Sequence, residues 1–143
     1  MREQTELTKP RDIAILAGLS SPRLDAKDNA DEESMEELEA LVETAGGEAA
    51  VSVLQNRASP DPRTFIGEGK VAEIKELVKV TEATTVIFDN DLSPSQMRVL
   101  TEELGVQVLD RSALILDIFA QRARTREGRL QVELAQYQYL LPR

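Results

Sequence analysis

Residues 84–96 read TTVIFDNDLSPSQ, and this stretch decides the class of fold. Its first part, Thr84–Phe88, is dense in β-branched residues and predicts a buried strand. The polar residues Asp89, Asn90 and Asp91 then form a turn. Ser93 at the N-cap, Pro94 at N1 and Gln96 at N3 form a capping box, which predicts that a helix starts here. A buried strand followed at once by a helix is the repeating unit of an α/β protein.

The same unit recurs on both sides of this stretch. All the predicted strands are short apolar runs, which indicates a parallel sheet buried on both faces by helices. We expect four strands in the order 2-1-3-4. Gly46 and Gly105 are expected to end two of the helices. The predicted strands cover 12–19, 48–55, 84–88 and 106–109, and the predicted helices cover 31–45, a segment from about residue 70, and 94–104.

Residues 110–143 differ from the rest of the chain. An apolar block at 114–119 runs into four arginines, and a second helical pattern follows. Its apolar residues lie on one helical face with nothing yet to pack against, which is typical of the arm of a larger protein. We therefore expect an α/β domain over 1–110 and the first part of a helical arm over 111–143. The exposed stripe consists of Leu130, Leu134, Tyr137 and Leu141.

The composition excludes several kinds of chemistry. The chain has no Cys and no His, so disulfides, thiolate chemistry, histidine catalysis and most zinc sites are excluded. It has no run of 18 apolar residues, so no membrane span is expected, and the lack of Cys fits the cytoplasm. The net charge is -9. Because residues 25–48 alone account for that value, a polyanionic partner can still bind elsewhere.

One candidate anion site is the segment Gly67-Glu68-Gly69-Lys70, at the start of a predicted helix. A glycine turn at a helix N-terminus offers free N–H groups to a phosphate. However, a P-loop needs Gly four residues before Gly-Lys and Ser or Thr after it, and here Thr64 and Val71 occupy those positions. Two interpretations stay open: a tight junction between loop and helix, or phosphate contact through Lys70.

A second candidate site lies at the predicted end of the third strand, where open α/β sheets gather their ligands. Asp89 and Asp91 stand there, and with Asp12 and Asp110 they could hold Mg²⁺ or accept a phosphoryl group. Asp12, however, starts its strand and so falls at the opposite edge of a parallel sheet. Asp91 and Asp110 also suit ordinary turn and N-cap roles. We predict no metal site here.

The arginine cluster is the strongest local signal. If the segment is helical, Arg122, Arg126 and Arg129 share one face, while Arg124 points elsewhere. Arginine pairs with phosphate oxygens through two parallel hydrogen bonds, so such a face suits a nucleic-acid backbone. The alternative is a hinge that is salt-bridged to a following domain.

At these residues the chain resembles the HflX family of ribosome-associated GTPases. The resemblance rests on the segment DRSALILDIFAQRARTREGRLQVELAQ, which starts at Asp110, and on TFIGEGK at 64–70. It also rests on IFDNDLSPSQ at 87–96, and it extends from about residue 13 to residue 143. The family pattern implies an N-terminal α/β domain, a long pair of helices and then a GTPase domain. Neither the motif GxxxxGK[ST] nor DxxG occurs in this chain, so GTP binding is not expected of it.

The resemblance implies a role at the large ribosomal subunit, in splitting stalled or idle ribosomes under stress. GTP and Mg²⁺ would serve the GTPase domain, and this chain would be non-catalytic and hold no cofactor. The predicted RNA-binding residues are Arg122, Arg124, Arg126, Arg129 and Lys70. Two alternatives stay open. The domain could bind ATP through Gly67, Gly69, Lys70, Asp89 and Asp91, or it could dock on its own GTPase domain and regulate it.

Overall fold

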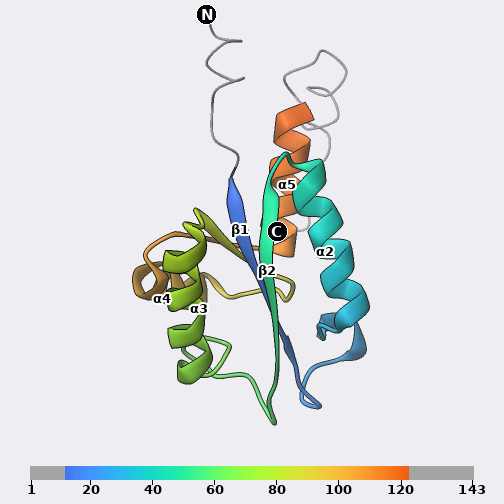
Figure 1. Ribbon diagram of the computed structural model, residues 1–143. Helices are drawn as coiled ribbons and strands as arrows, with labels where there is room; N and C mark the ends of the chain where they lie inside the picture. Colours follow the sequence, from blue (N-terminus) through green and yellow to red (C-terminus); the bar gives the residue numbers. More distant parts are fainter. Residues whose placement is uncertain (1–11, 123–143) are drawn as a thin grey trace, which may run out of the picture.

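The computed structural model describes residues 12–122 of the chain (Figure 1). These residues form alternating strands and helices, as the sequence predicts. A 3-10 helix, η1 (Ala26–Asp28), lies between the first predicted strand and the first predicted helix. The other elements are β1 (Ile13–Ser20), α2 (Glu32–Thr44), β2 (Glu48–Asn56), α3 (Glu68–Thr81), β3 (Thr85–Phe88), α4 (Pro94–Leu104), β4 (Gln107–Asp110) and α5 (Arg111–Arg122).

The four strands form one parallel sheet in the order β2-β1-β3-β4, which confirms the predicted fold class and strand order. Leu16 of β1 lies opposite Ile87 of β3, and Ile87 lies opposite Leu109 of β4. β1 and β3 are the two central strands, and nearly all their residues are buried. The apolar runs of the sequence therefore correspond to the middle of the sheet.

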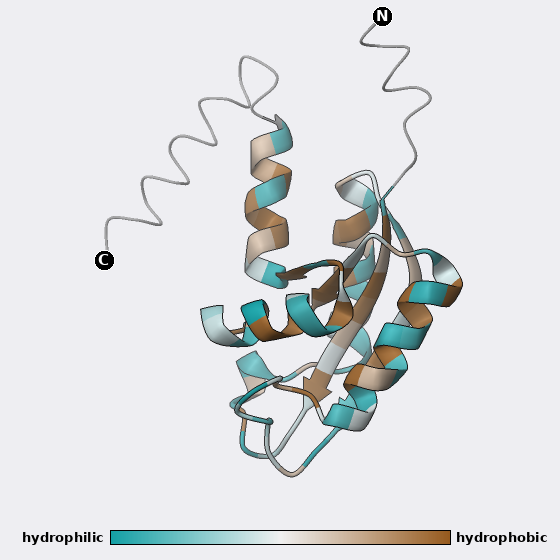
Figure 2. Cartoon of the chain, turned by 90° about the vertical axis from the view of Figure 1, so that its left-hand side faces the viewer, coloured by the Kyte–Doolittle hydropathy of each residue, from teal (hydrophilic) through white to brown (hydrophobic). Residues whose placement is uncertain are grey.

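Helices cover both faces of the sheet, and successive strand residues point to opposite faces. Ile15 and Ala17 share a core with α3 and α4, whereas Ala14 and Leu16 share a core with α2 and α5. In Figure 2 the strands are mainly brown, and the helices carry teal, hydrophilic turns. None of the helices in the described residues is both long and apolar enough to cross a membrane.

Helix α5 belongs to this core although it starts after the predicted boundary at residue 110. Its residues Leu114 and Ile118 are buried in the same cluster as Leu38 of α2. The described part of the predicted C-terminal region therefore packs on the sheet. The predicted stripe (Leu130, Leu134, Tyr137, Leu141) lies outside the described residues.

The expectation that every strand is buried on both faces is wrong for β2. Only Val53 of this strand is buried, because β2 lies at the edge of the sheet and is flanked by one neighbour, β1. The pairing of β1 with β2 also shifts: Ala14 lies opposite Ala49, and Ile15 lies opposite Val51. Ala50 is thus the extra residue of a β-bulge.

The predicted helix ends are largely as expected. Ser93 accepts a hydrogen bond from the Gln96 N–H, and the Gln96 side chain accepts one from the Ser93 N–H, so the predicted capping box is confirmed. Gly105 ends α4 with φ +75°, a left-handed conformation that glycine adopts without strain. A second capping box, which the sequence reasoning missed, joins Asp31 and Ser34 at the start of α2.

Candidate functional site

The topological switch point of the sheet is the crevice between the carboxyl ends of β1 and β3. From β1 the chain crosses to β2 on one side, and from β3 it crosses to β4 on the other. Open α/β sheets bind ligands at such a switch point. A polar cavity of about 310 Å³ lies here, lined by residues of η1, α2 and α5 and by Asp89, Asn90 and Asp91 after β3. The prediction that Asp89 and Asp91 follow β3 at this edge is therefore confirmed.

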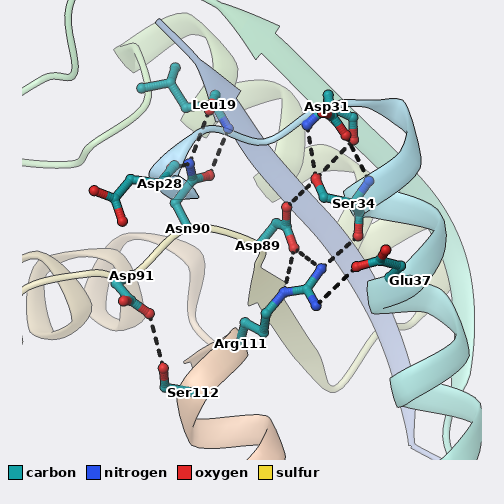
Figure 3. Close-up of polar contacts among 10 residues, drawn as sticks. All are labelled: Leu19, Asp28, Asp31, Ser34, Glu37, Asp89, Asn90, Asp91, Arg111 and Ser112. Atoms are coloured by element: carbon teal, nitrogen blue, oxygen red, sulfur yellow. Dashed lines mark hydrogen bonds and ion pairs between the residues drawn. The ribbon is translucent and has the colours of Figure 1, made fainter. Parts of the chain in front are cut away.

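The Asn90 side chain bridges the two sides of the crevice beside this cavity. Its Oδ1 accepts a hydrogen bond from the Leu19 N–H (2.8 Å), and its Nδ2 donates to the Leu19 carbonyl (3.0 Å). The same Nδ2 donates to the Asp28 carbonyl (2.8 Å). Asn90 is 4% exposed. Its amide thus pairs with the backbone near the carboxyl end of β1 and with η1, at the place where an open sheet would admit a ligand (Figure 3).

Asp89 forms a second closed contact beside Asn90. Arg111 at the start of α5 donates to Asp89 Oδ1 from Nε (2.8 Å) and Nη2 (2.5 Å). Ser34 donates its hydroxyl to Asp89 Oδ2 (2.6 Å), and Arg111 Nη2 also donates to the Ser34 carbonyl (2.7 Å). Glu37 lies 3.7 Å from Arg111 Nη1. Figure 3 shows this cluster joining three elements: the end of β3, the start of α2 and the start of α5.

This arrangement leaves Asp89 with little free capacity to bind a metal ion. Both oxygens of Asp89 already accept strong hydrogen bonds, and its side chain is only 3% exposed. Among residues 12–122, no three Asp or Glu side chains are grouped in a way that could hold a metal ion. The cluster therefore works as a structural joint in the described domain.

The other aspartates considered from the sequence have local partners. Asp110 accepts from the N–H groups of Leu92 (3.1 Å) and Ala113 (2.9 Å), which is a capping role at the start of α5. Asp91 accepts from the Ser112 hydroxyl (3.1 Å). Asp12 lies at the opposite edge of the sheet, as predicted, where it accepts from Thr84.

The Gly67–Lys70 segment lies at the start of α3, with Gly67 as its N-cap. The Gly67 N–H donates to the Gln55 side chain (3.0 Å), and the guanidinium of Arg57 lies against Gly67. Lys70 is paired with Glu73 at 2.9 Å. Gly67, Gly69 and Lys70 do not line the cavity beside Asp89 and Asp91. The structure thus does not bring together the two halves of the predicted nucleotide site.

The loop before α3 is more constrained than its sequence indicates. Thr64, Phe65 and Ile66 are all buried. The Ile66 N–H donates to the Thr64 carbonyl (2.7 Å) around Phe65, which has φ +68°. A bulky residue with positive φ is an outlier, and backbone strain of this kind gathers at turns and functional segments.

Asp61 fixes the other end of this loop. Its Oδ1 accepts from the N–H groups of Arg63 (2.8 Å) and Thr64 (3.1 Å). These two hydrogen bonds stabilise the charged carboxylate and lower the pKa of Asp61 below its ordinary value of 3.8. Arg63 in turn is paired with Glu103 of α4 at 2.6 Å, and this ion pair raises the pKa of Arg63.

The predicted RNA-binding arginines fall at the border of the described residues. Arg122 is the last residue of α5, and Arg124, Arg126 and Arg129 lie outside the described residues. In contrast, α2 carries six glutamates and no lysine or arginine. The acidic and basic segments of the sequence therefore belong to different parts of the chain.

Comparison with known proteins gives consistent matches along the chain. Residues 32–120 match the family described as GTP-binding GTPase N-terminal, and residues 122–143 match the family described as GTP-binding GTPase Middle Region. A protein called GTPase HflX from Alkalihalophilus pseudofirmus is 50% identical over 137 residues, which are 94% of this chain and 32% of the relative. The GTPase HflX of Escherichia coli is 53% identical over 113 residues, which are 79% of this chain and 26% of the relative.

A solved structure gives the same answer for the fold. The crystal structure of a GTP-binding protein from the hyperthermophilic archaeon Sulfolobus solfataricus, in complex with GDP, aligns with a TM-score of 0.62 and 32% identity. The alignment covers 92% of this chain and 37% of that one. The chain thus spans about a third, or less, of the length of the curated relatives that it matches.

Proposed function

This chain belongs to the HflX family of GTPases, whose N-terminal region it matches, and we propose that its α/β domain is a non-catalytic module for binding the large ribosomal subunit. In this proposal GTP hydrolysis, with GTP and Mg²⁺, belongs to a separate GTPase domain of the whole protein. The module would help to place that protein on cytoplasmic ribosomes that are split or rescued under stress.

One observation carries the non-catalytic part of the proposal: the buried polar side chains at the switch point are paired with other groups of the protein. Asn90 makes three hydrogen bonds to backbone groups, and Asp89 beside it pairs with Arg111. A ligand in the cavity beside them could contact Asp89 or Asn90 only by displacing their present partners, which costs free energy. This supports a module that binds through its outer surface.

The charge distribution supports RNA contact beyond the carboxyl end of α5. Phosphates are repelled by the glutamates of α2, so that face is a poor RNA surface. Arg122 ends α5, and three more arginines follow it closely in the sequence. We place the RNA contacts on Arg122, Arg124, Arg126 and Arg129. Lys70 is a weaker candidate because Glu73 already neutralises it.

Co-sedimentation of the 143-residue chain with purified large subunits, over a series of salt concentrations, tests this proposal. Each phosphate contact neutralised adds roughly -0.7 to -0.9 to the slope of log affinity against log salt. We expect the triple variant Arg122→Glu/Arg126→Glu/Arg129→Glu to lose most of its affinity and most of that slope. The matched control is Lys75→Glu/Lys79→Glu/Arg98→Glu, which makes the same charge change at exposed sites elsewhere.

Equal losses in the two triple variants would mean that overall charge, and not the arginine segment, governs binding. No binding by the folded wild-type chain would contradict the proposal. Calorimetric titration with Mg²⁺ and ATP tests the alternative nucleotide role on the same preparation. Saturable binding that is lost in Asp89→Ala would favour that alternative, provided that the variant is folded.

A further inference from the structure

The outer edge of β2 is the longest exposed strand edge of the described domain. β2 spans nine residues, ends the sheet and pairs only with β1 among residues 12–122. Figure 1 views the sheet from this edge, with α2 on one side and α3 on the other. Backbone N–H and C=O groups on the outer side of an edge strand can pair with an added strand.

The carboxyl half of β2 lacks the features that usually protect an edge. The segment Val51–Asn56 (VSVLQN) contains no charged residue and no proline. The bulge at Ala50 disturbs only the amino half, because the pairing with β1 is regular from Val51 to Asn56. Proteins usually blunt such edges with lysine, proline or bulges. Within the described residues, the backbone groups on the outer side of this regular six-residue stretch have no strand partner.

A groove lined by apolar, polar and acidic side chains runs beside this edge. It has a volume of about 530 Å³ and lies between α2 and β2. Met35 and Leu54 supply apolar surface, and Ser52 and Asn56 supply polar groups. Three glutamates of α2 line it as well, all of them exposed and none in an ion pair within the described residues: Glu32, Glu36 and Glu39.

We propose that the β2 edge and this groove bind an extended polypeptide segment that carries lysine or arginine at alternate positions. Side chains of a strand point alternately to the two faces of a sheet. A strand added at Val51–Asn56 would therefore direct every second side chain to the α2 side, towards Glu32, Glu36 and Glu39. Cations at those positions match the unpaired carboxylates, and the backbone hydrogen bonds are independent of sequence.

The same charges argue against the other possible occupants. An RNA backbone would meet three unpaired carboxylates and be repelled. A second copy of this chain, paired edge to edge through β2, would bring two glutamate-lined α2 helices together at a cost in free energy. The inference goes beyond the proposed RNA contacts and does not depend on them, because it uses a different surface and a partner of opposite charge.

The experiment uses the 143-residue chain and a capped nine-residue peptide in which lysine and valine alternate. We expect slowed exchange of amides within Val51–Asn56, together with shifted backbone NMR signals of this segment and of Glu32–Glu39. A second peptide has its two central valines replaced by proline. It keeps the charge but loses N–H donors, so we expect it to bind far more weakly.

Matched variants of α2 separate the groove from the general acidity of the helix. Glu36→Lys/Glu39→Lys changes two groove glutamates, and we expect peptide affinity to fall by about tenfold or more. Glu33→Lys/Glu43→Lys makes the same change in charge at exposed sites that do not line the groove, and its affinity should stay within about twofold. All four sites are exposed, so both variants are expected to fold.

Three results would overturn the inference: no binding of the alternating peptide, signal changes confined to another surface, or equal binding of the proline peptide. An equal loss in the two double variants would also overturn it, because the long-range field of α2 would then explain the binding. Loss of ribosome binding in the arginine variants has no bearing on this test, so the two proposals fail separately.

Discussion

Two regions of the same sheet differ in whether their polar groups have partners. One is the corner at the carboxyl ends of β1, β3 and β4, and the other is the outer edge of β2. At the corner, Asn90, Asp89 and Arg111 are paired with protein groups. At the edge, the outer backbone groups of β2 have no strand partner within residues 12–122. The usual ligand site of an α/β sheet is therefore used in this domain to join β3, α2 and α5, and the proposed partner surfaces are away from it.

The closed corner also has a consequence for the arginine segment. Arg111 starts α5 and holds it to Asp89 after β3 and to Ser34 of α2. α5 precedes that segment in the sequence, and this joint fixes the start of α5 against the rest of the domain. The structural role of the corner is therefore compatible with the proposed binding role of the arginine segment after α5.

The largest change in stability is expected at Asp89, and it tests whether the paired groups of the corner hold the domain together. Asp89→Ala would leave Arg111 without its closest carboxylate. We expect the free energy of unfolding to fall by about 3 kcal/mol, the low end for a broken buried pair, because Arg111 is partly exposed. Urea denaturation measures this change. The control Asp91→Ala, at an exposed site with one hydrogen bond, should lose less than about 0.5 kcal/mol, and similar losses would contradict the described corner.

The next effect concerns Asn90. Asn90→Ala would leave the buried Leu19 N–H and two carbonyls without their partners, and we expect a loss of about 2 kcal/mol. Asn29 offers a control of the same residue type in a partly exposed loop, where we expect a loss of about 1 kcal/mol for Asn29→Ala. If Asn29→Ala proved the more damaging change, the crevice would not be bridged by Asn90.

A smaller, pH-dependent effect is expected at Asp61, in the loop that links the β2 edge to α3. Folding lowers the pKa of Asp61 from 3.8, so the charged carboxylate stabilises the folded state. This contribution is present above pH 3.8 and is lost as the pH falls through the folded pKa. Asp61→Asn should remove it. The gap in unfolding free energy between wild type and variant should therefore shrink in acid, and a constant gap would contradict the role of the charge.

The smallest effect is expected at the edge itself. Ser52 is exposed on β2, and we find no side-chain hydrogen bond for it among the described residues. Ser52→Lys should change the free energy of unfolding by less than about 0.5 kcal/mol. It should nevertheless weaken binding of the lysine-valine peptide, since it adds a cation to the groove. A large loss of stability would show that the edge is part of the rigid framework.

Much of the fold follows from local sequence signals. The apolar runs predict the central strands, and Ser93 with Gln96 marks the start of α4 correctly. The predicted strand order placed β2 at an edge, but its exposure was not predicted, because its alanine and valine residues were interpreted as buried on both faces.

The candidate site was predicted only in part. Asp89 and Asp91 stand at the expected edge, but the sequence reasoning interpreted Asn90 only as a turn residue and gave no role to Ser34 or Arg111. Their partners lie 71, 55 and 22 residues away in the sequence, so no local spacing reveals them. One signal was available. An Asp after β3 and an Arg after β4 become neighbours once the two strands are paired in parallel.

Hydrogen exchange of the chain, free and bound to large ribosomal subunits, tests most directly the claim that the corner is a joint and that binding occurs elsewhere. We predict slower exchange on binding at the carboxyl end of α5 and in the arginine segment that follows, with unchanged exchange at Leu19 and at residues 89–91. Slower exchange at the corner, with none around Arg122, would contradict the account and make the switch point the binding site.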